Sequence, residues 1–343
     1  MIARGGKLST LSGLGSTHHA LVNRLDSGLI EGYELGEIHE YPISKNPIKR
    51  ILRRWISGPK TITRKSIGHD IVHITDQEQA GLTPSDSRSV VTIHDLFHLF
   101  PTIRDNVIVG DQNPSLIRRK DITRIKNGIA RASLLICVSK DTQQECEMRF
   151  PGIPTVWIPH AIELESYRTE RPIPNWFDKG VNLLVIGSEE PRKRIEFVVN
   201  VCAGMNVTLH KIGAESSPAS KDKISQLAKK VGCKLNWVGR VSEDEKIAAL
   251  QHADALLFPS VAEGFGLPPL EAYAAGTVAL VADYPAHNEI PLEHHILPHD
   301  DINMWRAAIE ELQDESEEVI ARAEEFSVKR WAERHIEAYN SLF

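Results

Sequence analysis

The sequence has few of the residues that define disulfide-rich or membrane-spanning proteins. It contains 4 cysteines in 343 residues, and no two of them form a C-x-x-C pair. Widely spaced cysteines are typical of a reduced compartment, where they serve as small buried apolar groups. No apolar run reaches the ~18 residues that a membrane helix requires, and the first thirty residues lack the apolar core of a secretory signal. We therefore expect a cytoplasmic protein.

Several catalytic motifs are absent as well. The sequence contains no H-E-x-x-H, no P-loop pattern G-x-x-x-x-G-K-[ST] and no two aspartates separated by a single residue. These absences argue against a zinc peptidase, a P-loop nucleotidase and an enzyme that binds nucleotides through a D-x-D metal motif. We expect no required metal and no tightly bound cofactor.

The charge of the chain argues against nucleic-acid binding. Lys and Arg number 40 against 46 Asp and Glu, which gives a formal net charge of −6, whereas neutralising nucleic-acid phosphates calls for a basic domain. An apolar content of 41% and a length of 343 residues suffice for about two domains, each with a full core.

Short apolar runs alternate with helical patterns along the chain, which is typical of β–α units in a parallel sheet. A first series of buried strands is predicted at residues 90–93, 134–138 and 155–158, and a second at 183–186, 207–210, 235–238, 255–258 and 278–281. Between the two series, residues 159–179 contain three prolines and several charges, and we expect the hinge there. The polar segment MIARGGKLST at the start is a poor strand, which leaves open a shortened first strand of the fold.

The most informative segment is SVAEGFGLPPLEAYAAG, in which seven residues separate Glu263 from Glu271. Gly264 and Gly266 can take positive φ and let the backbone approach a ligand closely. The two prolines that follow suit the first turn of a helix, because they have no N–H to leave unpaired. A loop therefore leads directly into a helix.

The start of such a helix favours an anion, through its free N–H groups and the positive end of its dipole. A sugar-nucleotide diphosphate is the obvious candidate. Glu263 then lies before the loop and Glu271 in the first or second turn, so both carboxylates face one small volume. One can reach sugar hydroxyls and the other the ribose.

The whole string, with Ala274-Ala275-Gly276 and the apolar run 278–281 behind it, resembles the E-x7-E signature of retaining glycosyltransferases of family 4 or group 1. The resemblance implies an α/β fold with two facing Rossmann-like domains (GT-B) and an interdomain cleft. It implies an N-terminal acceptor-side domain at residues 1–165, a nucleotide-sugar-binding domain at 166–325, and a C-terminal helix at 326–343 that returns to the first domain.

Two cations follow the first strand predicted in the second domain, in Pro191-Arg192-Lys193. They lie at the carboxyl edge, where doubly wound sheets bind ligands. A surface pair at a helix start is the plain alternative, but the segment resembles the Pro-Arg-Lys of the family. The resemblance implies that Arg192 and Lys193 hold the donor diphosphate and stabilise the departing nucleotide.

The resemblance also assigns roles around the E-x7-E motif. Glu263 contacts the sugar and Glu271 the ribose. The donor site is completed by the loop residues between the two carboxylates, which are Gly264, Phe265, Gly266 and Leu267. His287 and Glu289 follow the strand at 278–281, and lining the donor pocket or belonging to an ordinary loop are both open for them.

Ser12-Gly13-Leu14-Gly15 resembles the glycine loop that lies over the phosphates from the opposite domain in this family. It also mimics the start of G-x-G-x-x-G. Because His18 occupies the third glycine position and the strand before it is poor, a nicotinamide-binding turn is excluded. A plain strand-to-helix turn is the alternative to phosphate binding by Gly13 and Gly15.

His94 directly follows the apolar strand at 90–93, in Ile93-His94-Asp95. A histidine at a strand end can hold a sugar hydroxyl or steady positive charge near the reacting carbon, and the Ile-His-Asp segment of the family lies beside the transferred sugar. Asp95 can orient His94 or cap the next turn, and both alternatives are open.

From Tyr41 to His69 the sequence has no acidic residue but eight cations. Five apolar residues fall on one face of a predicted helix that starts after Asn46 and Pro47 and ends at Gly58-Pro59, namely Ile48, Ile51, Leu52, Trp55 and Ile56. Residues 45–65 can therefore lie on an anionic membrane surface. An ordinary helix packed on the sheet shows the same apolar face, and the two alternatives are equally weighted.

The sequence thus predicts a metal-independent retaining glycosyltransferase that moves a hexose from a nucleotide-diphosphate sugar to a glycan or lipid-linked saccharide. The Ile-His-Asp and Pro-Arg-Lys segments resemble mannosyltransferase-like members somewhat more than others, which favours GDP-mannose. Two rivals share the architecture: a non-hydrolysing sugar-nucleotide epimerase, and a binding subunit without turnover.

Overall fold

The computed structural model describes residues 1–7 and 13–343, and the chain forms two compact α/β units. The first unit contains the described residues of 1–102 together with 110–160 and 329–343, and the second contains 103–109 and 161–328. The change of unit after His160 falls inside the segment 159–179 where the sequence places the hinge. Residues 329–343 are grouped with the first unit.

The first unit is built on a parallel sheet in the order β2-β1-β3-β4-β7-β8. Its strands are β1 (Ile2–Gly6), β2 (Ile38–Tyr41), β3 (Val72–Ile74), β4 (Ser89–Ile93), β7 (Leu134–Cys137) and β8 (Thr155–Trp157). Its helices include α1 (Gly13–Asp26), α2 (Pro47–Leu52), α3 (Gly58–Lys65), α4 (Leu116–Ile129) and α5 (Lys140–Arg149). The predicted strands at 90–93, 134–138 and 155–158 are confirmed as β4, β7 and β8.

The expectation that the N-terminal segment is a poor strand is wrong. Residues Ile2–Gly6 form β1, which lies between β2 and β3 in the sheet. The residue that makes the segment look polar is Arg4, and it is buried because its guanidinium pairs with the carboxylate of Asp76 at 2.5 Å. A buried charge is tolerated when it is paired and hydrogen-bonded. The partner lies just beyond β3, so the local sequence does not reveal it.

The helix predicted after Asn46 begins as expected, because the Asn46 side chain accepts from the N–H groups of Ile48 and Lys49. Its predicted end at Gly58-Pro59 is wrong. The chain passes through a π-helical turn (Arg53–Ser57) into α3. Pro59 has no N–H for the carbonyl of Trp55 four residues earlier. The Arg124 guanidinium of α4 donates to that carbonyl at 2.5 Å instead, so the helical path continues.

The second unit contains a parallel sheet in the order β11-β10-β9-β12-β13-β14. Its strands are β9 (Val181–Ile186), β10 (Val207–Ile212), β11 (Lys234–Gly239), β12 (Ala255–Phe258), β13 (Val278–Ala282) and β14 (Ile296–Leu297). Its helices are α6 (Leu164–Arg168), α7 (Ile195–Val201), α8 (Pro218–Val231), α9 (Glu243–His252), α10 (Leu267–Ala274), α11 (Ile302–Glu310) and α12 (Ser316–Glu324). All five strands predicted for this part are confirmed.

A short hairpin is formed by β5 (Thr102–Arg104) and β6 (Val107–Val109). Residues 103–109 are grouped with the second unit, although the segments before and after them belong to the first. The tip residues of the hairpin, Asp105 and Asn106, both have positive φ, the conformation of a tight hairpin turn. The Asp105 carboxylate pairs with the Arg194 guanidinium at 3.2 Å. No motif in the sequence predicts this ion pair.

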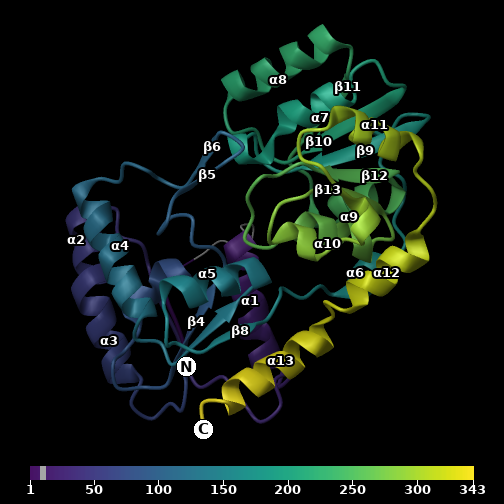
Figure 1. Cartoon of the computed structure of the whole chain (residues 1–343). Coiled ribbons are helices and arrows are strands. Elements are labelled where there is room, and N and C mark those ends of the chain that lie inside the picture. The colour runs from purple at the N-terminus through teal and green to yellow at the C-terminus, as the bar shows by residue number, and fades with distance from the viewer. Residues whose placement is uncertain (8–12) are drawn as a thin grey trace. The chain divides into compact units, whose positions relative to one another are not determined.

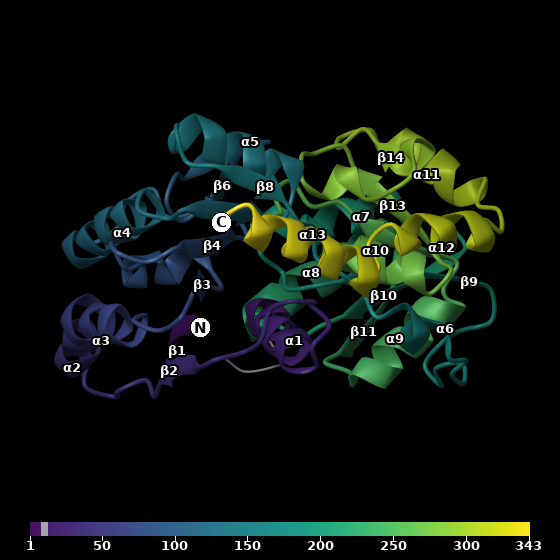
Figure 2. The same cartoon turned by 90° about the horizontal axis from the view of Figure 1, so that it is seen from below.

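Helix α13 (Val328–Asn340) packs in the first unit and places the C-terminus near the N-terminus (Figures 1 and 2). The Tyr339 hydroxyl bonds to Nδ1 of His73 at 2.8 Å, and the Arg24 guanidinium lies over the Trp331 ring at 4.6 Å. Buried aromatic and histidine side chains therefore fix the last helix against the sheet. No helix among the described residues is long and apolar enough to cross a membrane.

Candidate active site

The order of the second sheet fixes where a ligand site can form. The chain moves outward from β9 through β10 to β11, then crosses to the other side of β9 to form β12 and β13. Strands β9 and β12 therefore flank the point where the strand order reverses. In open parallel sheets, ligands bind outside the carboxyl ends of the strands at such a point. The segments after β9 and β12 carry Pro191-Arg192-Lys193 and Glu263.

The segment after β9 forms a 3-10 turn at Pro191–Lys193, and Arg194 follows it in the left-handed conformation with φ of 48°. The loop after β12 is fastened to this turn by two hydrogen bonds. The N–H of Val261 donates to the carbonyl of Arg192 at 2.9 Å, and the Arg192 side chain donates to the carbonyl of Ala262 at 3.0 Å. These backbone contacts hold the two segments in fixed register, so Glu263 meets both cations.

Glu263 is the centre of the charged cluster. Lys193 Nζ lies 2.5 Å from its Oε1, and Arg192 Nη1 lies 2.9 Å from its Oε2. Burial opposes ionisation of this carboxyl, but the cations of Lys193 and Arg192 outweigh it and lower the pKa of Glu263 to about 2. Glu263 is therefore a carboxylate at every physiological pH. Three residues that the sequence assigns to one site are thus in direct contact.

The loop then enters α10 through Gly266. This glycine has φ of 115°, and a Cβ built on it would lie 2.7 Å from the Cβ of His287. Only glycine fits that backbone conformation and that close approach. Gly264 does not have a positive φ, so the expectation that both glycines use this freedom holds only for Gly266. Phe265 is buried and packs its ring on Phe326 at 5.9 Å, which makes it a support of the loop.

Leu267 starts α10, and Pro268 and Pro269 occupy the next two positions. The predicted placement of the prolines in the first turn is confirmed. It also removes two of the four N–H groups that a helix start normally offers. The dipole of α10, which lies beside β13 (Figure 1), still favours an anion, but fewer amide donors are available than the sequence led us to expect.

Glu271 lies in α10 and forms an ion pair with a lysine of α9. Lys246 Nζ of α9 is 2.9 Å from Glu271 Oε1 and 2.8 Å from Glu243 Oε1. Burial raises the pKa of the Tyr167 hydroxyl, and the neighbouring Glu271 carboxylate adds to this effect. Sequence reasoning missed Lys246 and Tyr167, because neither belongs to a motif and they come from α9 and α6.

His287 completes the surroundings of Glu263. It is fully buried, its ring meets that of Phe258 edge-on at 5.4 Å, and neither ring nitrogen has a hydrogen-bond partner within the described part of the chain. Burial lowers the pKa of His287 to about 4, although the Glu263 carboxylate acts in the opposite direction. Two unsatisfied nitrogens in a buried ring are costly unless a ligand or water meets them.

In the first unit, His94 lies at the carboxyl end of β4 and is nearly buried. Its Nε2 donates to the carbonyl oxygen of Thr75 at 3.0 Å, so Nδ1 is the acceptor that faces Nε2 of His160 at 3.4 Å. Burial lowers the pKa of both histidines, which keeps them neutral. The sequence predicted His94 but not His160, whose ring stacks on it.

The structure also decides two smaller questions in this unit. The Asp95 carboxylate accepts from the N–H of Phe97 at 3.2 Å, which is the capping role. Gly13 and Gly15 lie in the first turn of α1 rather than in a loop before it, and Ser12 falls outside the described residues. The glycines therefore open a helix, and phosphate binding by them is still a hypothesis.

The part of the chain that contains this site matches a known protein family. Residues 166–326, which contain every member of the charged cluster, match the pattern of the group 1 glycosyl transferases. The predicted resemblance to the group 1 glycosyl transferases is therefore confirmed for this part of the chain.

Solved glycosyltransferases show the same architecture across the whole chain. The lipopolysaccharide outer core galactosyltransferase WaaB matches with a TM-score of 0.72 at 16% identity, over 100% of this chain and 99% of its own. Anabaena HepE, solved in complex with UDP, matches with a TM-score of 0.75 at 15% identity, over 99% of each chain. The chain therefore has the GT-B fold, as predicted.

Curated relatives of the transferase are mannosyltransferases of lower coverage. Escherichia coli WbdA, a serotype-specific mannosyltransferase, is 26% identical over 198 residues, which span 53% of this chain and 24% of WbdA. The phosphatidyl-myo-inositol mannosyltransferase of Mycobacterium tuberculosis strain H37Rv is 24% identical over 179 residues, 49% of this chain and 46% of that protein. The chain thus matches about a quarter to a half of the length of these relatives.

Proposed function

We propose that this chain transfers a hexose, with retention of configuration, from a nucleotide-diphosphate sugar to a glycan or lipid-linked saccharide, with GDP-mannose as donor. The observation that carries the proposal is the buried carboxylate of Glu263 held between Lys193 and Arg192 at the reversal point of the second sheet. The match of residues 166–326 to the group 1 glycosyl transferases and the mannosyltransferase relatives support it.

Charge explains how the cluster can serve transfer. Lys193 and Arg192 pair with Glu263, and Arg192 also pairs with the half-exposed Glu190 at 2.8 Å, so these four charges balance. A donor diphosphate can displace Glu190 from Arg192 and bind both cations. When the diphosphate binds, Arg192 and Lys193 contact its oxygens and Glu263 turns to the sugar. His287, with its unpaired ring nitrogens, offers a further hydrogen bond to a sugar hydroxyl. Glu271 binds the ribose, oriented by Lys246.

The proposed reaction needs no protein base. The bond between the anomeric carbon and the phosphate oxygen breaks, and positive charge develops on the sugar ring. The acceptor hydroxyl oxygen then bonds to the anomeric carbon on the same face, and its proton passes to an oxygen of the leaving phosphate. Arg192 and Lys193 stabilise the negative charge that grows on the diphosphate. Fixed side-chain cations thus do the work that Mg²⁺ does elsewhere, and we propose metal-independent transfer.

The experiment that tests the proposal offers GDP-mannose, UDP-glucose, UDP-galactose and ADP-glucose in turn, with and without a mannose-terminated lipid-linked acceptor, in the presence of EDTA. We expect GDP release that depends on the acceptor, and an α-linked product by NMR. An isomerised nucleotide sugar formed without acceptor would establish the epimerase instead. No turnover with any donor, together with tight donor binding, would establish the binding subunit.

We further propose that residues 45–65 rest on an anionic membrane surface, which brings the enzyme to a lipid-linked acceptor on the cytoplasmic face. Ile48, Leu52 and Ile56, spaced four residues apart, are 68%, 50% and 49% exposed. Helix α2 has no buried residue among those described. The apolar face is therefore not used up by packing on the sheet, and the cations around it can attract anionic lipids at about 1 kcal/mol each.

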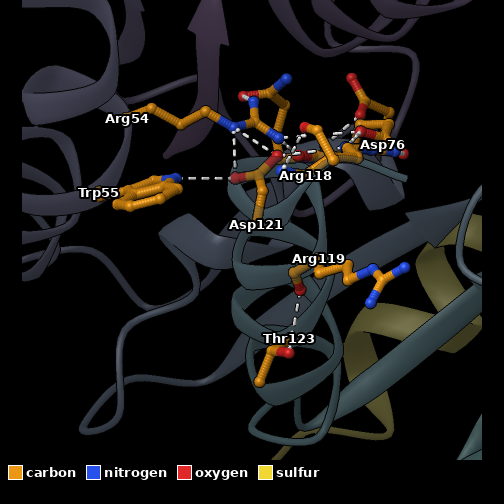
Figure 3. Close-up of polar contacts among 10 residues, drawn as sticks. Arg54, Trp55, Asp76, Arg118, Arg119, Asp121 and Thr123 are labelled. Carbon is orange, nitrogen blue, oxygen red and sulfur yellow. Dashed lines mark hydrogen bonds and ion pairs between the residues drawn. The ribbon is translucent and has the colours of Figure 1, made fainter. Parts of the chain in front are cut away.

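An ion-pair network holds this segment in place (Figure 3). The Asp121 carboxylate of α4 accepts from Arg54 at 2.8 Å and from the Trp55 indole at 2.9 Å, and Arg118 Nη1 donates to it at 3.1 Å. Arg118 also forms a two-pronged contact with Glu78 at 2.8 and 2.9 Å. Trp55 is thereby hydrogen-bonded to α4, whereas Ile48, Leu52 and Ile56 stay exposed.

A further inference from the structure

A cluster of two histidines and one carboxylate lies in the second unit apart from the Glu263 cluster. His294 and His295 belong to a 3-10 turn (Glu293–His295) just before β14, and Glu315 is the residue that precedes α12. His294 Nε2 is 2.7 Å and His295 Nε2 is 3.3 Å from Oε2 of Glu315. One ligand atom from each residue lies within 4.8 Å of the other two, the one such group found in the described residues.

His295, the buried histidine of the pair, is oriented by a hydrogen bond at its other ring nitrogen. His295 is 3% exposed, and its Nδ1 lies 2.5 Å from the hydroxyl of Tyr273. That hydroxyl also accepts from the N–H of Leu292 at 3.0 Å. A histidine that binds a metal through Nε2 normally donates its other ring N–H to an oxygen, which fixes its tautomer and orientation. The Tyr273 oxygen is placed to accept that hydrogen, so His295 is oriented as a ligand.

We propose that His294, His295 and Glu315 bind one Zn²⁺ ion through Nε2, Nε2 and a carboxylate oxygen, with water as the fourth ligand. Imidazole and carboxylate are ordinary zinc ligands, at about 2.0–2.2 Å in a tetrahedral arrangement. These bond lengths place neighbouring ligand atoms roughly 3.3 Å apart. The His295–Glu315 separation of 3.3 Å already fits. The His294 side chain, 54% exposed, lies 2.7 Å from Glu315 and has solvent on one side, so it can rotate to reach the same ion.

The charges around the cluster are compatible with a divalent cation. The carboxylates of Glu315, which precedes α12, and of Glu318 in its first turn both act electrostatically on His295. Arg322, whose charge acts on the Tyr273 hydroxyl beside His295, donates to the carbonyls of Glu289 and Ile290 and pairs with Glu325. Glu325 offsets this positive charge, and the carboxylates of Glu315 and Glu318 favour binding of a cation.

The ion would cross-link elements that lie far apart in the sequence. It ties the turn before β14 to the start of α12, and through the Tyr273 hydroxyl it reaches α10 two residues beyond Glu271. The inferred role is structural stabilisation of the second unit. It does not place the ion in the transfer reaction and is independent of the proposed donor.

The test uses the full chain purified without a histidine tag and stripped with EDTA. Co²⁺ titration should give visible d–d absorption of a four-coordinate site at one ion per chain, and Zn²⁺ should displace it and raise Tm. His294→Ala and Glu315→Gln should each weaken Zn²⁺ binding at least about tenfold. His98→Ala, which removes an exposed histidine from the first unit, is the matched control and should bind as the wild type does.

Equal Zn²⁺ affinity in His294→Ala, Glu315→Gln and wild type would overturn the proposal, as would an octahedral Co²⁺ spectrum in all of them. Because His294 is exposed, its replacement should leave the apo protein folded, and circular dichroism of the apo variants checks this. Transfer in EDTA separates the two proposals: His294→Ala should keep the wild-type rate, since Arg192, Lys193 and Glu263 are untouched.

Discussion

Lys193 Nζ lies 2.5 Å from Glu263 Oε1, although 70 residues separate the two in the chain. The contact joins the turn after β9 to the loop after β12, the two strands that flank the reversal of strand order. The Lys193 ammonium group therefore pairs with a buried carboxylate at the edge of the sheet where ligands bind.

Replacing either partner should impair transfer. We expect Glu263→Ala and Lys193→Ala each to lower kcat/KM at least about tenfold, roughly 1.4 kcal/mol of transition-state stabilisation, because sugar contact or leaving-group charge is lost. Nucleotide release at varied donor concentration measures it. Lys230→Ala, an exposed lysine of α8, is the control and should be silent. Wild-type rates in both site variants would remove the site assignment.

The ionisation of Glu263 should appear in acid stability. Its pKa falls from 4.5 to about 2 on folding, so the ionised carboxylate contributes stability above pH 4.5 that is lost as pH falls towards 2. Urea midpoints measured from pH 7 to pH 2 should show the difference between wild type and Glu263→Gln changing in favour of the variant across that window. A difference that stays constant with pH would contradict the ionised, paired state of Glu263.

Gly266 should tolerate no side chain. Gly266→Ala adds a Cβ that would lie 2.7 Å from the His287 Cβ, on a backbone with φ of 115°. We expect a loss of about 1–3 kcal/mol in the free energy of unfolding, together with weaker nucleotide-sugar binding. Gly13→Ala in the first turn of α1 meets nothing within 4 Å and should be neutral or slightly stabilising. Similar thermal stability of the two variants would show that the loop into α10 is not constrained.

Membrane association should depend on both parts of the 45–65 surface. The double variant Ile48→Ser/Leu52→Ser should sediment less with phosphatidylglycerol vesicles, because exposed apolar area is removed. Lys49→Ala/Arg50→Ala should weaken binding most at low salt, since the electrostatic part is screened as ionic strength rises. Met148→Ser, which is 70% exposed in α5, is the control. Equal sedimentation of all variants would assign the exposed apolar face another role.

Much of the fold could be predicted from the sequence, because apolar runs, capping residues and prolines act on the segment in which they stand. The eight strands named from apolar runs are all present, and Asn46 and the prolines after Gly266 start helices where expected. The misses share one cause. Arg4 looks unfit for a strand until Asp76 neutralises it, and Pro59 looks like a helix end until Arg124 takes the carbonyl it cannot satisfy. In each case the deciding partner lies on a different element.

The amino-acid sequence by itself determined the parallel β–α architecture and the loop-to-helix geometry after β12. Apolar runs mark the strands, and glycine and proline restrict the backbone wherever they stand. Only the tertiary structure decided which charges meet: Glu263 with Arg192 and Lys193, Glu271 with Lys246, and His94 with His160. Those pairs depend on strand order and helix packing, which bring distant segments within the few ångströms over which a buried ion pair or hydrogen bond acts.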